Sequence, residues 1–110
     1  MPPGEVAIRV RFSKPAIADL KRIADWIGDR SDEEVGEAYV RRIEAHCRRL
    51  SDFPRRGRMR EEFGSGVRST AFERRATILY RIDGDVVIID TVLYAGRERA
   101  STPPPSEAPR

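Results

Sequence analysis

The sequence predicts an α+β domain of the order β-α-α-β-β-β, with a helical hairpin packed on one face of a small, mainly antiparallel four-stranded sheet. The first observation is the segment 76–94, where two runs rich in β-branched and aromatic residues flank Asp83-Gly84. Such residues favour a pleated sheet, and Asp-Gly is a strong hairpin signal. The second observation is two upstream segments whose apolar residues recur at helical spacing, so that each has one apolar stripe.

The first strand is expected at Val6–Phe12, where apolar and basic residues alternate. Alternation with a period of two is typical of a half-buried strand. This strand must join the same sheet as the others, either at an edge or beside the final strand.

The first helix is expected to begin after Ser13, a good N-cap, and to end near Ile27 before Gly28. The second is expected to begin with a capping box formed by Ser31 and Glu34 and to end near Leu50. The short link between the two helices predicts an antiparallel hairpin.

The segment Asp52–Gly66 is punctuated by proline and glycine and predicts a loop. It is also the most basic stretch of the chain, with Arg55, Arg56, Arg58 and Arg60. A third short strand is expected at Val67–Phe72. The run Val86–Asp90 is apolar on successive residues, which predicts a strand covered on both faces or central in its sheet.

Length and composition bound the protein class. The 110 residues suit one domain, expected over 1–100, and the Pro-rich segment 101–110 is expected to be disordered. The single cysteine cannot form an internal disulfide and fits a protein of the reducing cytoplasm, whereas the net charge of +3 is modest and decides little. No apolar run reaches the roughly 18 residues of a membrane span, so no membrane association is expected.

Few residues suit catalysis. His46 lies within the apolar stripe of the second helix, and a packed histidine is the favoured interpretation over a general base or ligand. Neighbouring helix positions point in different directions, so His46 and Cys47 do not predict a metal site. No phosphate-binding glycine loop of common spacing is present, so neither metal nor cofactor is expected.

Arginines on the predicted sheet and its loops are the remaining candidates for a binding site. Guanidinium groups suit phosphate or carboxylate, so the cluster could hold RNA, DNA or an acidic protein segment. A solvated sheet face with local ion pairs is an equally open interpretation. Arg68 and Arg97 are favoured because each projects from a rigid sheet edge. The candidate residues are Arg68, Arg74, Arg75, Arg81, Arg97 and Arg99.

Several segments, taken in order, resemble the RelE/ParE superfamily of toxins from type II toxin–antitoxin systems, and its ParE side in particular. VRFSKPAIADLKRIADWI resembles the family's first strand and opening helix, and LSDFPRRGR resembles its exit from the second helix. GVRSTAF and ATILYRIDGDVVIIDTVLYAGRE resemble its G-[LVI]-R strand, its Y-R hairpin and its closing segment. The resemblance covers residues 6–99.

The resemblance implies a toxin in a hetero-oligomer with a cognate antitoxin, whose acidic, partly disordered segment covers the toxin's working surface. ParE-like members poison DNA gyrase without being enzymes, and that function is favoured here. The alternative is a RelE-like, ribosome-dependent mRNA endonuclease, for which Arg68, Tyr94 and Arg97 are the candidate catalytic residues. A third possibility is an inactive relative that only binds antitoxin.

Overall fold

The computed structural model describes residues 8–95. The predicted tail, the start of the first strand, Arg97 and Arg99 lie outside the described residues. The helices and strands in chain order are β1 (Arg9–Phe12), α1 (Lys14–Arg30), α2 (Glu33–Arg48), β2 (Arg58–Met59), β3 (Arg68–Phe72), β4 (Ala76–Asp83) and β5 (Val86–Tyr94). Short 3₁₀ turns occupy Arg49–Ser51, Pro54–Arg56 and Glu61–Phe63.

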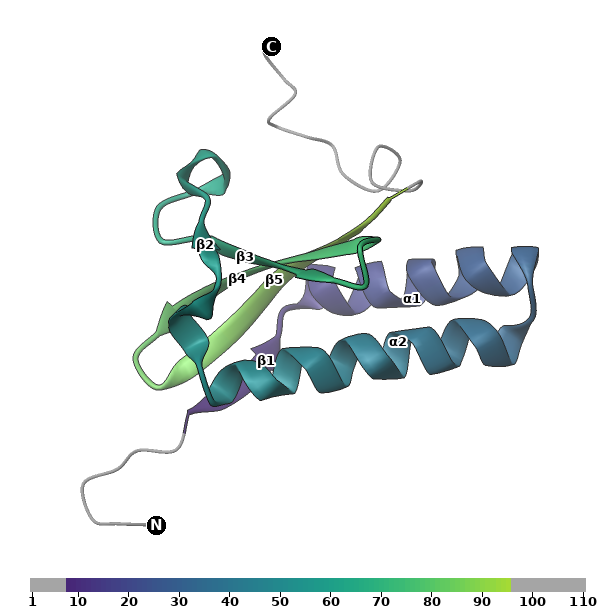
Figure 1. Ribbon diagram of the computed structural model, residues 1–110, viewed down its shortest axis with the longest axis horizontal. Coiled ribbons are helices and arrows are strands. Elements are labelled where there is room, and N and C mark those ends of the chain that lie inside the picture. Colours follow the sequence, from purple (N-terminus) through teal and green to yellow (C-terminus); the bar gives the residue numbers. More distant parts are fainter. Residues whose placement is uncertain (1–7, 96–110) are drawn as a thin grey trace.

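Two layers make up the domain: the α1–α2 hairpin and a sheet of strand order β1-β5-β4-β3-β2 (Figure 1). The pairings are antiparallel except that of β1 with β5, which is parallel. The predicted class and the helical hairpin are confirmed. The strand count differs, because two residues of the predicted loop pair with Ser69 and Arg68 and form a fifth, edge strand.

The junction between the helices corrects the predicted caps. The backbone N–H of Ser31 donates to the Ile27 carbonyl at 2.8 Å, so Ser31 closes α1 three residues beyond the predicted glycine. Asp32 is the N-cap of α2, and its carboxylate accepts the Val35 N–H at 3.0 Å. An aspartate suits this position because it also complements the helix dipole. The predicted Ser31–Glu34 capping box is therefore wrong.

β5 is an inner strand, as its unbroken apolar run predicted, but β1 pairs only with its first half. The edge of β5 that β1 leaves unpaired is hydrogen-bonded instead by Ser13, the N-cap of α1, and by Asp19 of α1. Ser13 donates its N–H to the Ile89 carbonyl and its hydroxyl to the Asp90 carbonyl. Asp19 is buried on α1, and its Oδ2 accepts the Val92 N–H at 3.0 Å. These bonds fix α1 to the sheet in one register.

The β4–β5 hairpin is confirmed, with its turn one residue further along than predicted. Asp83 pairs with Val86, so Gly84 and Asp85 form the two-residue loop. Gly84 has φ +63°, which glycine adopts without the steric penalty of a Cβ. A positive φ at the first loop position is what a type II′ hairpin turn requires.

The core lies between the helices and the sheet. Its fully buried members include Ile43, Leu50, Ile78, Tyr80 and Val92. None of the helices within residues 8–95 is long and apolar enough to cross a membrane.

Candidate functional site

The sheet face away from the helices carries arginine side chains among apolar ones. Arg81 and Arg11 lie on this face in register with Ile88, one on each neighbouring strand. Arg81, a predicted binding residue, donates to both carboxylate oxygens of Asp90 at 2.8 and 3.3 Å. This hydrogen bonding raises the pKa of Arg81 above its ordinary value. Arg81 is therefore held in a cross-strand ion pair.

The same face has an apolar hollow of about 380 Å³. The side chains that line it come from the start of α1, the loop before β3, and strands β4 and β5: Ser13, Pro15, Phe63, Val67, Leu79, Asp90, Thr91 and Leu93. Five of the eight lining side chains are apolar. A hollow of this kind suits apolar side chains of a partner segment.

Arg68, the favoured candidate, points to the other side of the sheet, where it fastens the loop after α2. One of its guanidinium nitrogens donates to the Arg55 carbonyl at 3.2 Å and to the Gly57 carbonyl at 3.1 Å. The side chain is only half exposed. Arg68 therefore holds in place the loop that carries Arg55.

Tyr80 fastens the same loop from the core. Its hydroxyl donates to the Pro54 carbonyl at 2.8 Å and accepts the Gly57 N–H at 3.0 Å. A Cβ on Gly57 would lie 2.5 Å from the Tyr80 hydroxyl and 2.7 Å from the Ser69 carbonyl oxygen. Only glycine fits there, which is the physical reason for the glycine in the F-P-x-x-G-R segment.

Arg74 and Arg75 lie in the β3–β4 turn, at the far end of the sheet from this loop. Glu73 and Arg74 have φ of 51° and 64°, a region that L-residues rarely adopt. Glu73 accepts two hydrogen bonds from Arg42 of α2, at 3.1 and 3.0 Å, which hold the turn against the helix. Arg75 lies over the ring of Tyr94. Arg74 is exposed and makes no ion pair within the described residues.

Tyr94, a candidate catalytic residue, belongs to a buried aromatic cluster. Its ring centroid lies 5.5 Å from those of Trp26 and Tyr39, both in edge-on contact, and its exposed fraction is 6%. Burial, followed by the neighbouring Tyr94, raises the pKa of Tyr39 to about 12. The cluster is a packing feature of the interface between helices and sheet.

Arg68 and Tyr94 are not brought together. Arg68 pairs with Tyr80 and Tyr94 pairs with Ala76, so the two lie four residues apart along β4. At about 3.3 Å per residue, that is a separation of roughly 13 Å along the strand. The third candidate, Arg97, lies outside the described residues. Of the three candidate catalytic residues, the two that the structure describes therefore do not share a site.

His46 and Cys47 are packed into the domain, but the Nε2 of His46, which was expected to be hydrogen-bonded, has no partner among the described residues. His46 packs against Phe72, and burial, followed by the charges of Arg49 and Arg56, lowers its pKa. Cys47 is fully buried, which raises its pKa to about 12 and leaves the thiol protonated. No group of three metal-binding side chains occurs within residues 8–95.

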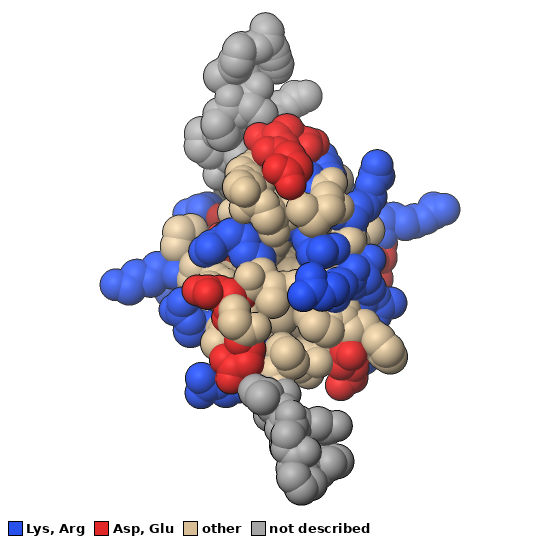
Figure 2. Space-filling view, turned by 90° about the vertical axis from the view of Figure 1, so that its left-hand side faces the viewer, with Lys and Arg blue, Asp and Glu red and all other residues tan. Residues whose placement is uncertain are grey.

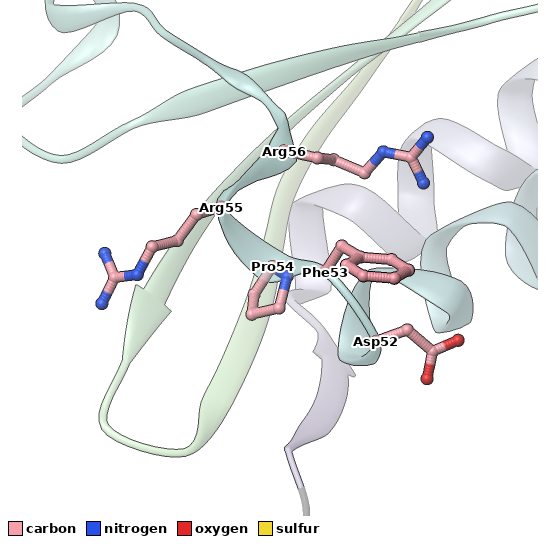
Figure 3. A pocket seen from close by; sticks show the side chains of 5 residues that line it. All are labelled: Asp52, Phe53, Pro54, Arg55 and Arg56. Carbon is pink, nitrogen blue, oxygen red and sulfur yellow. The ribbon is translucent and has the colours of Figure 1, made fainter.

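One surface was missed by the sequence analysis. Phe53 is 67% exposed between α2 and β2, although a phenylalanine side chain is usually buried. It lines a hollow of about 600 Å³ together with Asp52, Pro54, Arg55 and Arg56 (Figure 3). The available signal was an aromatic residue within the most basic stretch of the chain.

The fold is that of a toxin of the RelE/ParE superfamily. Residues 10–99 match the sequence profile described as "ParE toxin of type II toxin-antitoxin system, parDE". The chain is 34% identical over 85 residues to Toxin ParE3 of Caulobacter vibrioides, covering 77% of this chain and 84% of that protein. The chain therefore belongs to the ParE toxin family of type II toxin–antitoxin systems.

Two solved structures share the fold. One, described as the chromosomal ParDE toxin–antitoxin system from P. aeruginosa, has a TM-score of 0.72 at 22% identity, covering 81% of this chain and 97% of that one. The other, the RelBE2 toxin–antitoxin complex from Mycobacterium tuberculosis, has a TM-score of 0.60 at 26% identity, covering 81% of this chain and 99% of that one.

Proposed function

We propose that this protein is a cytoplasmic toxin that binds and poisons DNA gyrase and is neutralised by a cognate antitoxin. Membership of the ParE family is the main support. The separation of Arg68 from Tyr94 is the structural observation that favours a binding mechanism over RNA cleavage. In-line cleavage of RNA needs an acid, a base and cations around one phosphate.

The proposed antitoxin partner is a chain with an acidic, partly disordered segment that orders on the open sheet face. Apolar side chains of that segment fill the hollow between Leu79 and Leu93, and its carboxylates pair with arginines such as Arg11. Coupled folding and binding suits an apolar hollow bordered by charge. Both solved relatives are toxin–antitoxin systems by their descriptions, which supports a hetero-oligomer.

The antitoxin site is tested by co-expression of toxin and antitoxin followed by gel filtration. Leu93→Glu places a charge in the hollow and is expected to abolish the complex. Ile17→Glu is the matched control, because Ile17 is 54% exposed on α1 and does not line the hollow. Equal loss of the complex with both variants would place the antitoxin elsewhere.

Gyrase poisoning is tested with purified toxin, gyrase, ATP and supercoiled plasmid, scored for linear DNA after denaturation. Linear DNA that requires both proteins is the expected result. Among the predicted binding residues, Arg74 and Arg75 are exposed at one turn, so Arg74→Ala/Arg75→Ala tests whether that turn faces gyrase.

A toxin that stops growth yet yields no linear DNA would refute the proposal. In that case cut sites on translated mRNA, lost in Tyr94→Phe and Arg97→Ala, would establish the endonuclease alternative. A chain that has no effect on growth when expressed without antitoxin would establish an inactive relative.

A further inference from the structure

The charges of the domain are separated along α2. Residues 48–60 contain six arginines and one aspartate, a net charge of +5, and residues 25–37 contain six acidic residues and one arginine, a net charge of −5. These segments lie at opposite ends of α2, whose 16 residues span about 24 Å. A polyanion is attracted to residues 48–60 and repelled from residues 25–37. This charge separation orients a polyanionic ligand as it approaches the protein.

Five of the six arginines in residues 48–60, the basic end of the domain, make no ion pair within the described residues. Arg60 bonds Glu62, but the other five are exposed and make no ion pair with any residue between 8 and 95. These five are Arg48, Arg49, Arg55, Arg56 and Arg58. Arg81 and Arg42, by contrast, form ion pairs with Asp90 and Glu73. Figure 2 looks onto this end of the molecule and shows basic side chains around a central uncharged surface, with fewer acidic groups interspersed among them.

Phe53 stands in the middle of this basic segment with its ring in solvent. Figure 3 shows Phe53 and Arg56 extending to the same side of the loop, Arg55 to the opposite side, and Asp52 beyond Phe53 from Arg56. An exposed aromatic ring in an arginine-rich loop matches the stacking platforms that bind unpaired bases. Asp52, the one acidic side chain of the hollow, lies on the far side of the ring from Arg56.

The loop is held rigid, which makes the ring a fixed platform. The Pro54 carbonyl and the Gly57 N–H are bonded to Tyr80, and the Arg55 and Gly57 carbonyls are bonded to Arg68. Little conformational entropy therefore remains to be lost when a ligand orders on Phe53. The same bonds leave the side chains of Arg55 and Arg56 directed into solvent.

We propose that the Phe53 platform, comprising Phe53, Arg55 and Arg56, binds single-stranded nucleic acid directly, with a base stacked on Phe53 and adjacent phosphates on the two arginines. The neighbouring arginines of the basic end extend the phosphate track. The contact goes beyond the proposed action on gyrase, because the platform binds without gyrase or antitoxin present. Unpaired arginines in this density suit the repeating charge of a nucleic-acid backbone better than the mixed charges of a protein surface.

The test is fluorescence anisotropy of the free toxin with a labelled single-stranded oligonucleotide of about 12 nucleotides, repeated from about 50 to 200 mM salt. Micromolar affinity at low salt, weakening with salt, is expected for phosphate-driven binding. Arg55→Ala/Arg56→Ala removes two phosphate contacts and should reduce the slope of log affinity against log salt by about 1.4. Phe53→Ala removes stacking and should weaken binding about tenfold or more with the slope unchanged.

Two control variants make the same kinds of change, loss of two positive charges and truncation of an exposed apolar side chain, outside the basic end. Lys21→Ala/Arg41→Ala removes two exposed positive charges outside the basic end, and Ile17→Ala truncates an exposed apolar side chain on α1. Both are expected to leave affinity within about twofold. All four variants alter exposed side chains, and circular dichroism with thermal melting confirms that each is folded.

Three results would overturn the proposal. One is the lack of any anisotropy change at protein concentrations of about 1 mM, well above ordinary non-specific affinities. Another is equal weakening by the control pair and the Arg55/Arg56 pair. The third is tighter binding of a duplex of the same length, which excludes base stacking. If the free toxin does not bind oligonucleotides but Phe53→Ala abolishes gyrase poisoning, the Phe53 platform binds a protein rather than nucleic acid.

Discussion

Replacing Tyr80 with phenylalanine removes one oxygen atom from a site where it makes two hydrogen bonds. The hydroxyl donates to the Pro54 carbonyl at 2.8 Å and accepts the Gly57 N–H at 3.0 Å, and the side chain is fully buried. A hydrogen bond of this kind stabilises by about 1 kcal/mol net, and more is lost when its partners stay buried without replacement. We expect Tyr80→Phe to lower the free energy of unfolding by about 2 to 3 kcal/mol.

Tyr39→Phe is the matched control. Tyr39 is also buried, but its hydroxyl has no hydrogen-bond partner among the described residues. Removing a polar atom of that kind relieves desolvation, so stability should stay the same or rise. The two variants make the same chemical change at two buried tyrosines, one with a hydrogen-bonded hydroxyl and one without.

Urea denaturation followed by circular dichroism measures the difference. A loss of 2 to 3 kcal/mol corresponds to a fall of about 10 to 20 °C in Tm for a domain of this size. The denaturant slope should stay unchanged, because the area exposed on unfolding is the same. Equal effects of Tyr80→Phe and Tyr39→Phe would refute the reasoning. Tyr80→Phe should also weaken oligonucleotide binding, since it loosens the loop that presents the platform.

Three further predictions concern stability. Gly57→Ala should destabilise by about 2 kcal/mol or more, because its Cβ would clash with backbone and with Tyr80; thermal melting measures this, and an unchanged Tm would contradict the close approach. Asp19→Ala should cost about 1.5 to 3 kcal/mol in urea denaturation by leaving the buried Val92 N–H unpaired, while exposed Asp25→Ala should cost little. His46 has a lowered pKa in the folded state, so its contribution is present above about pH 6.5 and is lost as pH falls through the folded value. Stability of wild type should therefore decline more than that of His46→Leu between pH 7 and 5, and parallel declines would exclude a role for His46.

Local patterns were sufficient to predict both helices and four of the five strands. Helical spacing of apolar residues located both helices, and β-branched runs located β4 and β5. The caps between the helices were misassigned because Ser31 and Asp32 are both good N-caps, and a pattern of residue types does not say which carbonyl the Ser31 N–H reaches. The two-residue β2 has too little pattern to be recognised, because its pairing depends on β3 being in place.

The candidate site was less accessible to sequence reasoning. The arginine-rich composition and the order of the motifs led to the correct family. They did not predict which arginines are engaged in ion pairs or hydrogen bonds within the domain. Arg81 turned out to be paired with Asp90, and Arg68 to be committed to loop carbonyls. Strand register brings Asp90 to Arg81, and folding of the loop brings its carbonyls to Arg68. Neither contact can be read from the residue types alone.

The sequence by itself determined the α+β class, the order of its elements and the ParE family, because these depend on periodicity and on motifs that are local in the chain. The tertiary structure alone decided what the motif residues do. Asp19 bonds a strand 73 positions away, and Tyr80 bonds a loop 26 and 23 positions away. Those contacts bury polar atoms that must be paired, so they fix the geometry of the loop, in which Phe53 is exposed within a segment that carries unpaired arginines.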